Sequence, residues 1–209
     1  MSDIIEQALQ FKKENSSRFL DELISFVSIP SISTDISAKP DMQKAAEWVA
    51  GQLRNLGMSR VQVMPTAGHP VVFGESLQAG KDKPVVLVYG HYDVQPAEPL
   101  ELWHSPPFEP TRSGENLFGR GASDMKGQIV ACLKAIESLS TSGNLPVNVK
   151  FLIEGEEEIG SPNLAAFILE NKELLSSDFA LNPDAGMLTP DLPTITYGLR
   201  GLAYFEVHV

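Results

Sequence analysis

Apolar residues recur along the chain with two different spacings, and the alternation between them predicts the order of its secondary structure. Helical spacing covers residues 3 to 28 and about 41 to 56, and Gly57 ends the second stretch. A continuous apolar run at 83 to 90, KPVVLVYG, is typical of a strand buried on both faces. Short strands are also expected at RVQVMP and PVVFGE, which lie between the second helix and this run.

The rest of the chain continues this alternation. A helix is expected over 124 to 140, a strand at PVNVKFLIEG, a helix over 161 to 175 with Ser161 as its N-cap, and a strand at DFALN. Residues 95 to 123 are rich in Pro, Gly and Ser and predict a long loop. Strands that alternate with helices predict an α/β fold with a mostly parallel sheet and helices on both faces.

The pattern changes at about Thr194. The segment TITYGLRGLAYFEVHV alternates like a half-exposed pair of strands, and a structural role is expected for His208 on the last of them. The alternation reaches Val209 without a turn or a cap. We therefore expect the natural protein to continue beyond this residue.

Composition narrows the classes of partner. The chain of 209 residues has 27 acidic and 16 basic residues, and this formal net charge of −11 disfavours nucleic acid or an anionic membrane as the main partner. Its single cysteine, Cys132, rules out a disulfide framework. The N-terminus lacks the pattern of a secretion signal, and no apolar run reaches about 18 residues, so a cytoplasmic protein is expected.

Acidic residues and a histidine follow the ends of the predicted strands. His91 and Asp93 come directly after the strand at 83 to 90, the run EGEEEIGS follows the next strand, and Asp184 follows the last one in NPDAG. Asp124 opens the helix that separates the first two of these strands. Because ligands bind outside the carboxyl ends of parallel strands, we expect these groups to converge at one edge of the sheet.

Each of these groups has an ordinary explanation when it is taken alone. The acidic run is typical of a solvated loop, Asp124 of a helix N-cap, and Asp184 of a turn. Together they favour a divalent metal site, since imidazole and carboxylates are the usual zinc ligands outside all-cysteine sites. Residues two apart in a strand point the same way, so Asp93 is placed to accept the second ring N–H of His91.

The motifs GHYDVQP, LFGRGASDMKG, EGEEEIGS and NPDAGM occur in this order, and with them the chain resembles the co-catalytic zinc metallopeptidase family. That family includes carnosine dipeptidase, acetylornithine deacetylase, succinyl-diaminopimelate desuccinylase, aminoacylase and glutamate carboxypeptidase. The sequence GHYDVQP, followed by WHSPPFEP, is most similar to the dipeptidase branch. The resemblance implies an incomplete catalytic domain over 1 to 198 and, over 199 to 209, the opening strand of an inserted lid and dimerisation domain.

The resemblance also implies which residues bind metal. His91 and Asp184 match ligands of the first metal, and Glu158 matches a ligand of the second. Asp124 matches the bridging carboxylate, which in the family is often followed by a cis peptide bond. Asp93 matches the aspartate that orients the histidine.

Glu157 matches the general base of the family, with Gly160 and Ser161 fixing its register within the acidic run. The implied reaction is hydrolysis of a peptide or amide bond in a small substrate, with a dipeptide expected. Two zinc ions per full-length subunit, bridged by Asp124 and a water, would support it, and cobalt or manganese could replace zinc. The family resemblance further implies a homodimer of the full-length protein.

The family has two further histidines, a ligand of the second metal and one on the lid, and this chain does not supply them. Its histidines are His69, His91, His104 and His208. His69 and His104 are expected to be exposed or at the rim of a pocket. The chain of 209 residues is therefore expected to hold about one zinc ion tightly and to be inactive by itself.

Two other functions stay open at this point. One is an N-acyl amino acid deacylase of the same family, and the other is a metal-binding protein without catalytic activity. Other classes fit less well, because GESLQAGKD lacks the spacing of a phosphate loop and GRGASD lacks the third glycine of a dinucleotide site. No G-x-S-x-G motif of a serine hydrolase follows a predicted strand.

Overall fold

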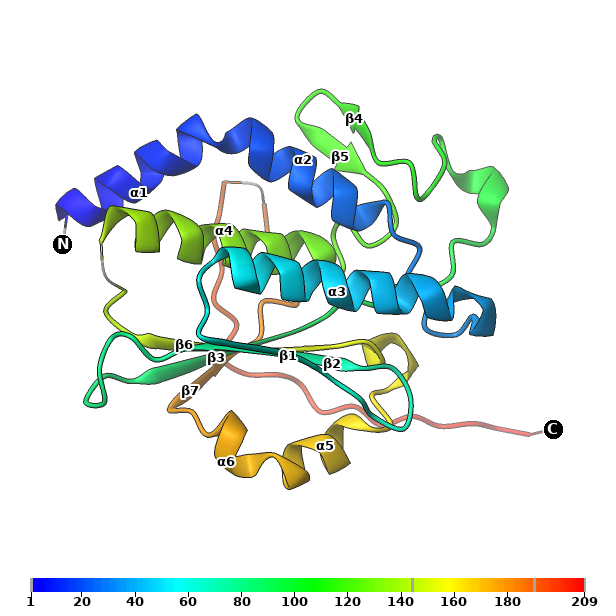
Figure 1. Cartoon of the computed structure of the whole chain (residues 1–209). Coiled ribbons are helices and arrows are strands. Elements are labelled where there is room, and N and C mark those ends of the chain that lie inside the picture. Colours follow the sequence, from blue (N-terminus) through cyan, green and yellow to red (C-terminus); the bar gives the residue numbers. More distant parts are fainter. Residues whose placement is uncertain (1, 144, 190, 209) are drawn as a thin grey trace.

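A central sheet with helices on both faces organises the molecule (Figure 1). The computed structural model describes residues 2–143, 145–189 and 191–208. Within these residues the sheet has five strands, in the spatial order β1 (Arg60–Met64), β2 (Val71–Ser76), β6 (Asn148–Glu154), β3 (Val85–His91) and β7 (Phe179–Leu181).

Four of these five described strands run in one direction. β6 pairs in parallel with β3, and β3 pairs in parallel with β7, whereas β2 is antiparallel to both β1 and β6. The register places Val85 beside Asn148 and His91 beside Glu154, so β3 and β6 begin and end together. The mostly parallel sheet predicted from the alternation of strands and helices is thus confirmed.

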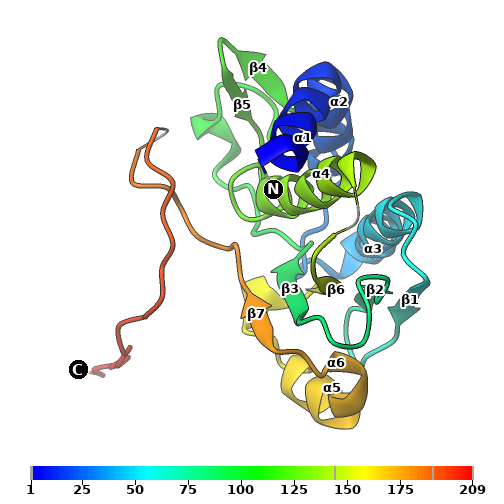
Figure 2. The same ribbon diagram turned by 90° about the vertical axis from the view of Figure 1, so that its left-hand side faces the viewer.

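The helices form two unequal layers. One face of the sheet is covered by α3 and α4, with α1 and α2 beyond them, and the other face by α5 and α6 (Figures 1 and 2). The bounds of these helices are α1 (Ser2–Glu14), α2 (Ser16–Val27), α3 (Lys39–Asn55), α4 (Lys126–Ser142), α5 (Leu164–Glu170) and α6 (Lys172–Leu175). No helix in the described part of the chain is both long enough and apolar enough to cross a membrane.

Two local details differ from the sequence predictions. The helix expected over 3 to 28 is two helices that part at Asn15, whose side-chain amide donates to the Phe11 carbonyl (2.9 Å). The loop expected over 95 to 123 contains a 3₁₀ helix, η2 (Leu100–Leu102), and a hairpin of β4 (Thr111–Ser113) and β5 (Asn116–Phe118). Strands of three residues are too short for a period of two to be recognised.

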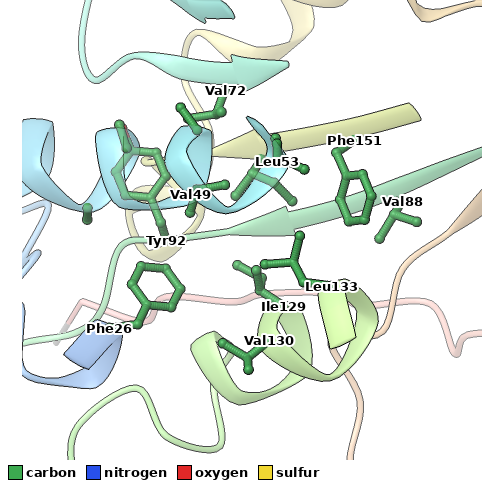
Figure 3. Packing of buried hydrophobic residues seen from close by; sticks show 14 of the residues in the cluster. Phe26, Val49, Leu53, Val72, Val88, Tyr92, Ile129, Val130, Leu133 and Phe151 are labelled. Carbon is green, nitrogen blue, oxygen red and sulfur yellow. The ribbon is translucent and has the colours of Figure 1, made fainter. Parts of the chain in front are cut away.

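The larger apolar core lies between the sheet and the helices α3 and α4. Figure 3 shows Leu53 of α3, Leu133 of α4 and Phe151 of β6 in this cluster, and all three side chains are fully buried. Burying a side chain of this size stabilises the fold by about 1.5–3 kcal/mol. β6 is buried along its whole length, so the strand ends that it shares with β3 rest on a rigid base.

The prediction that Ser161 caps a helix is wrong. Helix α5 begins at Leu164, and Ser161 lies before it in a left-handed conformation with φ 50°. Its hydroxyl donates instead to the carboxylate of Glu154 (2.8 Å). A hydrogen bond to a charged acceptor is stronger than one between neutral groups, which favours this arrangement over a cap.

The strand pair predicted from residue 194 onward is also wrong for the described residues 194–208. None of them lies in a strand, and apolar side chains such as Tyr197 and Tyr204 are 100% and 85% exposed. A strand needs a neighbour for its backbone hydrogen bonds, and in Figure 2 this segment runs away from the sheet. Val209 lies outside the described residues.

Candidate metal centre

His91 is the last residue of β3, and its imidazole is fully buried between two groups of oxygen atoms. Nδ1 lies 3.1 Å from the main-chain oxygen of Asp93 and 3.3 Å from its carboxylate. Nε2 lies 3.2 Å from Asp124 Oδ1, 3.7 Å from Asp184 Oδ2 and 3.8 Å from Glu157 Oε2. Within the described chain, Nε2 has no hydrogen-bond partner, although it is buried. A buried ring nitrogen that faces three carboxylates is suited to bind a cation.

Asp93 holds two parts of the site at once. Its side chain is fully buried, and its two carboxylate oxygens accept the backbone N–H groups of Glu157 (3.2 Å) and Glu158 (3.1 Å). These residues open the 3₁₀ helix η3 (Glu157–Ile159). One carboxylate therefore contacts the imidazole of His91 and also fixes the backbone of the acidic turn, a second contact that the H-x-D spacing does not predict.

The glutamates of the acidic run divide into two kinds. Glu154 and Glu156 are buried, and their carboxylates accept hydrogen bonds from β3 and from neighbouring loops. Glu157 and Glu158 are partly exposed and turn toward His91, and Glu158 also accepts a hydrogen bond from the Gln95 amide (2.8 Å). The register chosen from the sequence thus separates two structural glutamates from two that face the site.

The remaining two carboxylates come from loops on either side of His91. Asp124 lies two residues before α4, its side chain is 61% exposed, and its peptide bond to Met125 is cis, as the family resemblance implies. Asp184 follows β7, and its backbone N–H donates to Asn182 Oδ1 (3.0 Å) in the turn that the sequence NPDAG suggests. Both positions lie beyond the carboxyl ends of strands or at the start of a helix, where the fold was expected to gather ligands.

Two overlapping sets of described residues have ligand atoms within 4.8 Å of one another. One set is His91, Asp124 and Glu158, and the other is His91, Glu157 and Asp184. This grouping places Glu157 among the possible ligands, whereas the resemblance implies a general base there. Asp124 and Asp184 both lie within 3.7 Å of His91 Nε2, so the implied first-metal set of these three residues also fits the positions.

The charges of the site influence one another strongly. Burial would lower the pKa of His91, but the hydrogen bond and charge of Asp93, with the charges of Glu157 and Asp184, outweigh it and raise the pKa to about 9. Burial raises the pKa of Glu157 and of Glu158, and neighbouring carboxylates add to the rise. Because a divalent cation among the carboxylates would remove their repulsion, the donor set fits a divalent metal ion.

The other three histidines belong to neither set of described ligands. His69 is half-buried with Nε2 3.2 Å from the Ser33 carbonyl oxygen, and His104 is exposed and lines a cleft of about 550 Å³. The structural role expected for His208 on a strand is wrong, because its side chain is 84% exposed and lies 3.2 Å from Glu206.

Some buried residues near the site were not predicted from the sequence, and Lys126 is the clearest example. Its side chain is fully buried near the start of α4. A signal was present, because Lys126 is spaced at three, four and seven residues from Ile129, Val130 and Leu133, which are all buried. A lysine on the apolar face of a predicted helix is therefore a sequence signal for buried acceptors.

Comparison with known proteins gives consistent matches. The family described as Peptidase family M20/M25/M40 matches residues 87–209. The Cys-Gly metallodipeptidase dug1 of Schizosaccharomyces pombe is 33% identical over 222 residues, which cover 99% of this chain and 45% of that protein. The Beta-Ala-His dipeptidase of Mus musculus is 33% identical over 225 residues, which cover 100% of this chain and 45% of that protein.

One solved structure is similar to this chain in both fold and sequence. The dipeptidase Dug1p from Saccharomyces cerevisiae superposes with a TM-score of 0.86 and 27% identity, over 95% of this chain and 44% of that one. The chain therefore spans a little less than half the length of the proteins that it matches.

Proposed function

The chain belongs to peptidase family M20/M25/M40, and we propose that the protein hydrolyses the peptide bond of dipeptides at the site around His91, with the help of bound metal ions. The observation that carries this proposal is the buried Nε2 of His91. It lies within 3.8 Å of carboxylates from three separate segments and has no hydrogen-bond partner among the described residues. Burying such a nitrogen costs free energy unless it binds a cation or forms a hydrogen bond.

We propose zinc as the metal, with two ions in each subunit of the natural full-length protein and with cobalt or manganese as substitutes. His91, Asp124, Glu158 and Asp184 would hold the ions, in line with the family motifs and with the short distances between their ligand atoms. When bound, zinc lowers the pKa of a water molecule and polarises the carbonyl of the bond to be cleaved.

The protein's own residues would orient the ligands and move the proton. Asp93 keeps the imidazole of His91 in place through Nδ1, so that Nε2 stays free for a metal. Glu157 would take the proton of the attacking water and deliver it to the leaving amine. Its raised pKa, caused first by burial and then by nearby carboxylates, suits a group that must accept and release a proton.

The substrate class is proposed from the relatives, because the chain covers a little less than half of their length. Those relatives are a Cys-Gly metallodipeptidase and a Beta-Ala-His dipeptidase, which supports a dipeptide over an N-acyl amino acid. The division after residue 198, a homodimer and a cytoplasmic location are further proposals. Gel filtration and cell fractionation of the natural full-length protein test the last two.

Metal depletion tests the proposed function. The protein at its natural full length is treated with a chelator and assayed with Cys-Gly, β-Ala-His and N-acetylated amino acids. Dipeptide hydrolysis should disappear and should return when zinc, cobalt or manganese is added back. Hydrolysis that survives complete depletion would contradict the proposal, and activity on N-acetylated amino acids alone would favour the deacylase.

A further inference from the structure

The segment between α2 and the site is held from one side by a buried lysine. The Lys126 ammonium group donates to the carbonyl oxygens of Phe26 (3.1 Å) and Ile29 (2.6 Å) and lies 5.0 Å from the centre of the Phe26 ring. Each of these oxygens also accepts a backbone N–H, Phe26 from Ile29 (3.2 Å) and Ile29 from Ser31 (2.9 Å), so Lys126 adds a second donor to both. Lys126 itself lies two residues after Asp124.

The same segment is bonded on its other side to residues 92 and 94, which directly follow the end of β3 at His91. The buried Ser31 hydroxyl donates to the carbonyl oxygen of Tyr92 (2.6 Å), and the backbone N–H of Val94 donates to the Ser31 carbonyl (2.9 Å). Ile32 and Val94 also form an isolated parallel bridge. Figure 3 shows Phe26 and Tyr92 in one buried cluster, so the segment is packed as well as hydrogen-bonded.

Residues 26–32 are therefore hydrogen-bonded to two parts of the proposed metal site, and each set of hydrogen bonds is called a link here. One link leads through Ser31 to Tyr92, which lies between His91 and Asp93. The other leads through Lys126 to the loop of Asp124. Neither Lys126 nor Ser31 belongs to the described sets of possible ligands, and both bond to backbone oxygens.

We propose that Lys126 and Ser31 are positioning residues, which set the separation of His91 from Asp124 by fastening both of their loops to residues 26–32. This inference rests on the proposed function, because it assumes that His91 and Asp124 bind metal. Removing either link should loosen the placement of the ligands while every ligand remains present. Partners of metal ligands that lie outside the coordination sphere typically change metal affinity by about 10–100-fold.

The chain offers a matched control for the lysine. Lys150 is likewise buried and donates to two backbone carbonyl oxygens, those of Leu174 (2.7 Å) and Ser176 (2.8 Å). Those acceptors lie at the end of α6, on the opposite face of the sheet from α4. Lys126→Met and Lys150→Met therefore remove the same kind of contact, but only the first is connected to the site.

The serine has a control of the same kind. Ser138 is buried in α4, and its hydroxyl donates to the Lys134 carbonyl (2.7 Å). Ser31→Ala and Ser138→Ala each delete one buried hydroxyl that bonds to a backbone oxygen. A comparison of the two separates the loss of a hydrogen bond from the loss of a link to the site.

Cobalt titration of the four variants tests the proposal, with the visible absorption of bound Co²⁺ and the thermal midpoint as readouts. Lys126→Met and Ser31→Ala should weaken cobalt binding by about 10–100-fold and alter the absorption spectrum. Lys150→Met and Ser138→Ala should lower the thermal midpoint and leave affinity and spectrum unchanged. If Lys126→Met does not fold, Ser31→Ala decides the question.

Two results would overturn the inference. One is wild-type affinity and spectrum in folded Ser31→Ala and Lys126→Met. The other is an equal loss of affinity in the control variants, which would mean that stability alone governs metal binding. No cobalt binding by the unmodified protein would refute the proposed function itself, and this inference with it.

Discussion

The two ends of the central sheet use their polar side chains for different purposes. At the end where β3 and β6 begin, the amide of Asn148 bonds to the backbone of Ala79 (3.2 Å), Gly80 (2.8 Å) and Lys83 (3.1 Å). Close by, the carboxylate of Asp178 accepts the Val85 N–H (2.7 Å). Every one of these contacts joins a polar side chain to backbone.

At the opposite end, where β3 and β6 finish, polar side chains face one another. His91 Nε2 lies within 3.8 Å of the carboxylates of Asp124, Glu157 and Asp184. Groups of like charge held this close together cost stability unless a cation lies between them. Polar residues bonded to backbone thus maintain the fold, whereas polar residues that face one another are available for chemistry.

The largest effect is expected for the proposed general base. Glu157→Gln in the natural full-length protein should reduce turnover by about 10²–10⁴-fold, because it removes the group that accepts the proton of water. Bound metal, measured by elemental analysis, should remain. Glu156→Gln is the matched control, since Glu156 belongs to the same acidic run but bonds to His69 and Asn163. Loss of metal in Glu157→Gln would make Glu157 a ligand instead.

Asp93→Asn should have the next largest effect. Asparagine of the same shape lacks the charge that faces His91 and has one oxygen in place of two for the N–H groups of Glu157 and Glu158. Zinc affinity measured by calorimetry should fall by about 10–100-fold. Asp178→Asn at the other end of the sheet should leave zinc affinity unchanged. Unchanged affinity in Asp93→Asn would mean that its contact with His91 has no effect on the metal.

Asn148→Ala should have the opposite effect, because it should lower stability without changing metal binding. It removes a buried amide with three backbone contacts, so the free energy of unfolding should fall by about 1–3 kcal/mol. Zinc affinity of the folded protein should stay the same. Asn148→Asp keeps an acceptor for Ala79 but turns a buried carboxylate oxygen toward the carbonyl oxygens of Gly80 and Lys83, so urea denaturation should show a larger loss than in Asn148→Ala. Weaker zinc binding in Asn148→Ala would show that the two ends are not independent.

The smallest effect is expected for Glu137, whose ion pairs lie away from both ends of the sheet. Burial raises the pKa of Glu137, but hydrogen bonds from Arg18 and Lys134 outweigh burial and bring the pKa below its ordinary value of 4.5. Its contribution is therefore present above pH 4.5 and is lost as the pH falls through the lower pKa of the folded state. Glu137→Gln should cost less than about 1 kcal/mol at pH 7, and the cost should shrink as the pH falls through the pKa of the folded state. An equal cost at both pH values, measured by urea denaturation, would contradict this account.

The sequence predicted the sheet and the convergence of the candidate site because both depend on local patterns and on the topology of parallel strands. His91 ends a strand, Asp184 follows one and Asp124 precedes a helix, and this placement carries all three to one end of the sheet. The contacts of Asp93 with the acidic turn were not predictable, because they join residues 64 and 65 positions apart.

The errors have a similar origin. The alternation after residue 194 specifies a strand only if a neighbouring strand is present, and periodicity carries no information about that neighbour. Ser161 has the side chain of a helix cap, but a buried carboxylate seven residues earlier accepts its hydroxyl instead. Both cases show local preference overridden by tertiary contacts, which spacing alone does not reveal.

The buried Nε2 of His91 is proposed to bind a divalent metal at the carboxyl ends of the strands. Zinc titration of His91→Ala tests this proposal. The unmodified protein should bind zinc tightly in a calorimeter, and His91→Ala should lose more affinity than Asp93→Asn, because it removes a ligand. His104→Ala, which alters an exposed histidine outside the described ligand sets, should bind as the unmodified protein does. Unchanged zinc affinity in a folded His91→Ala protein would contradict the account.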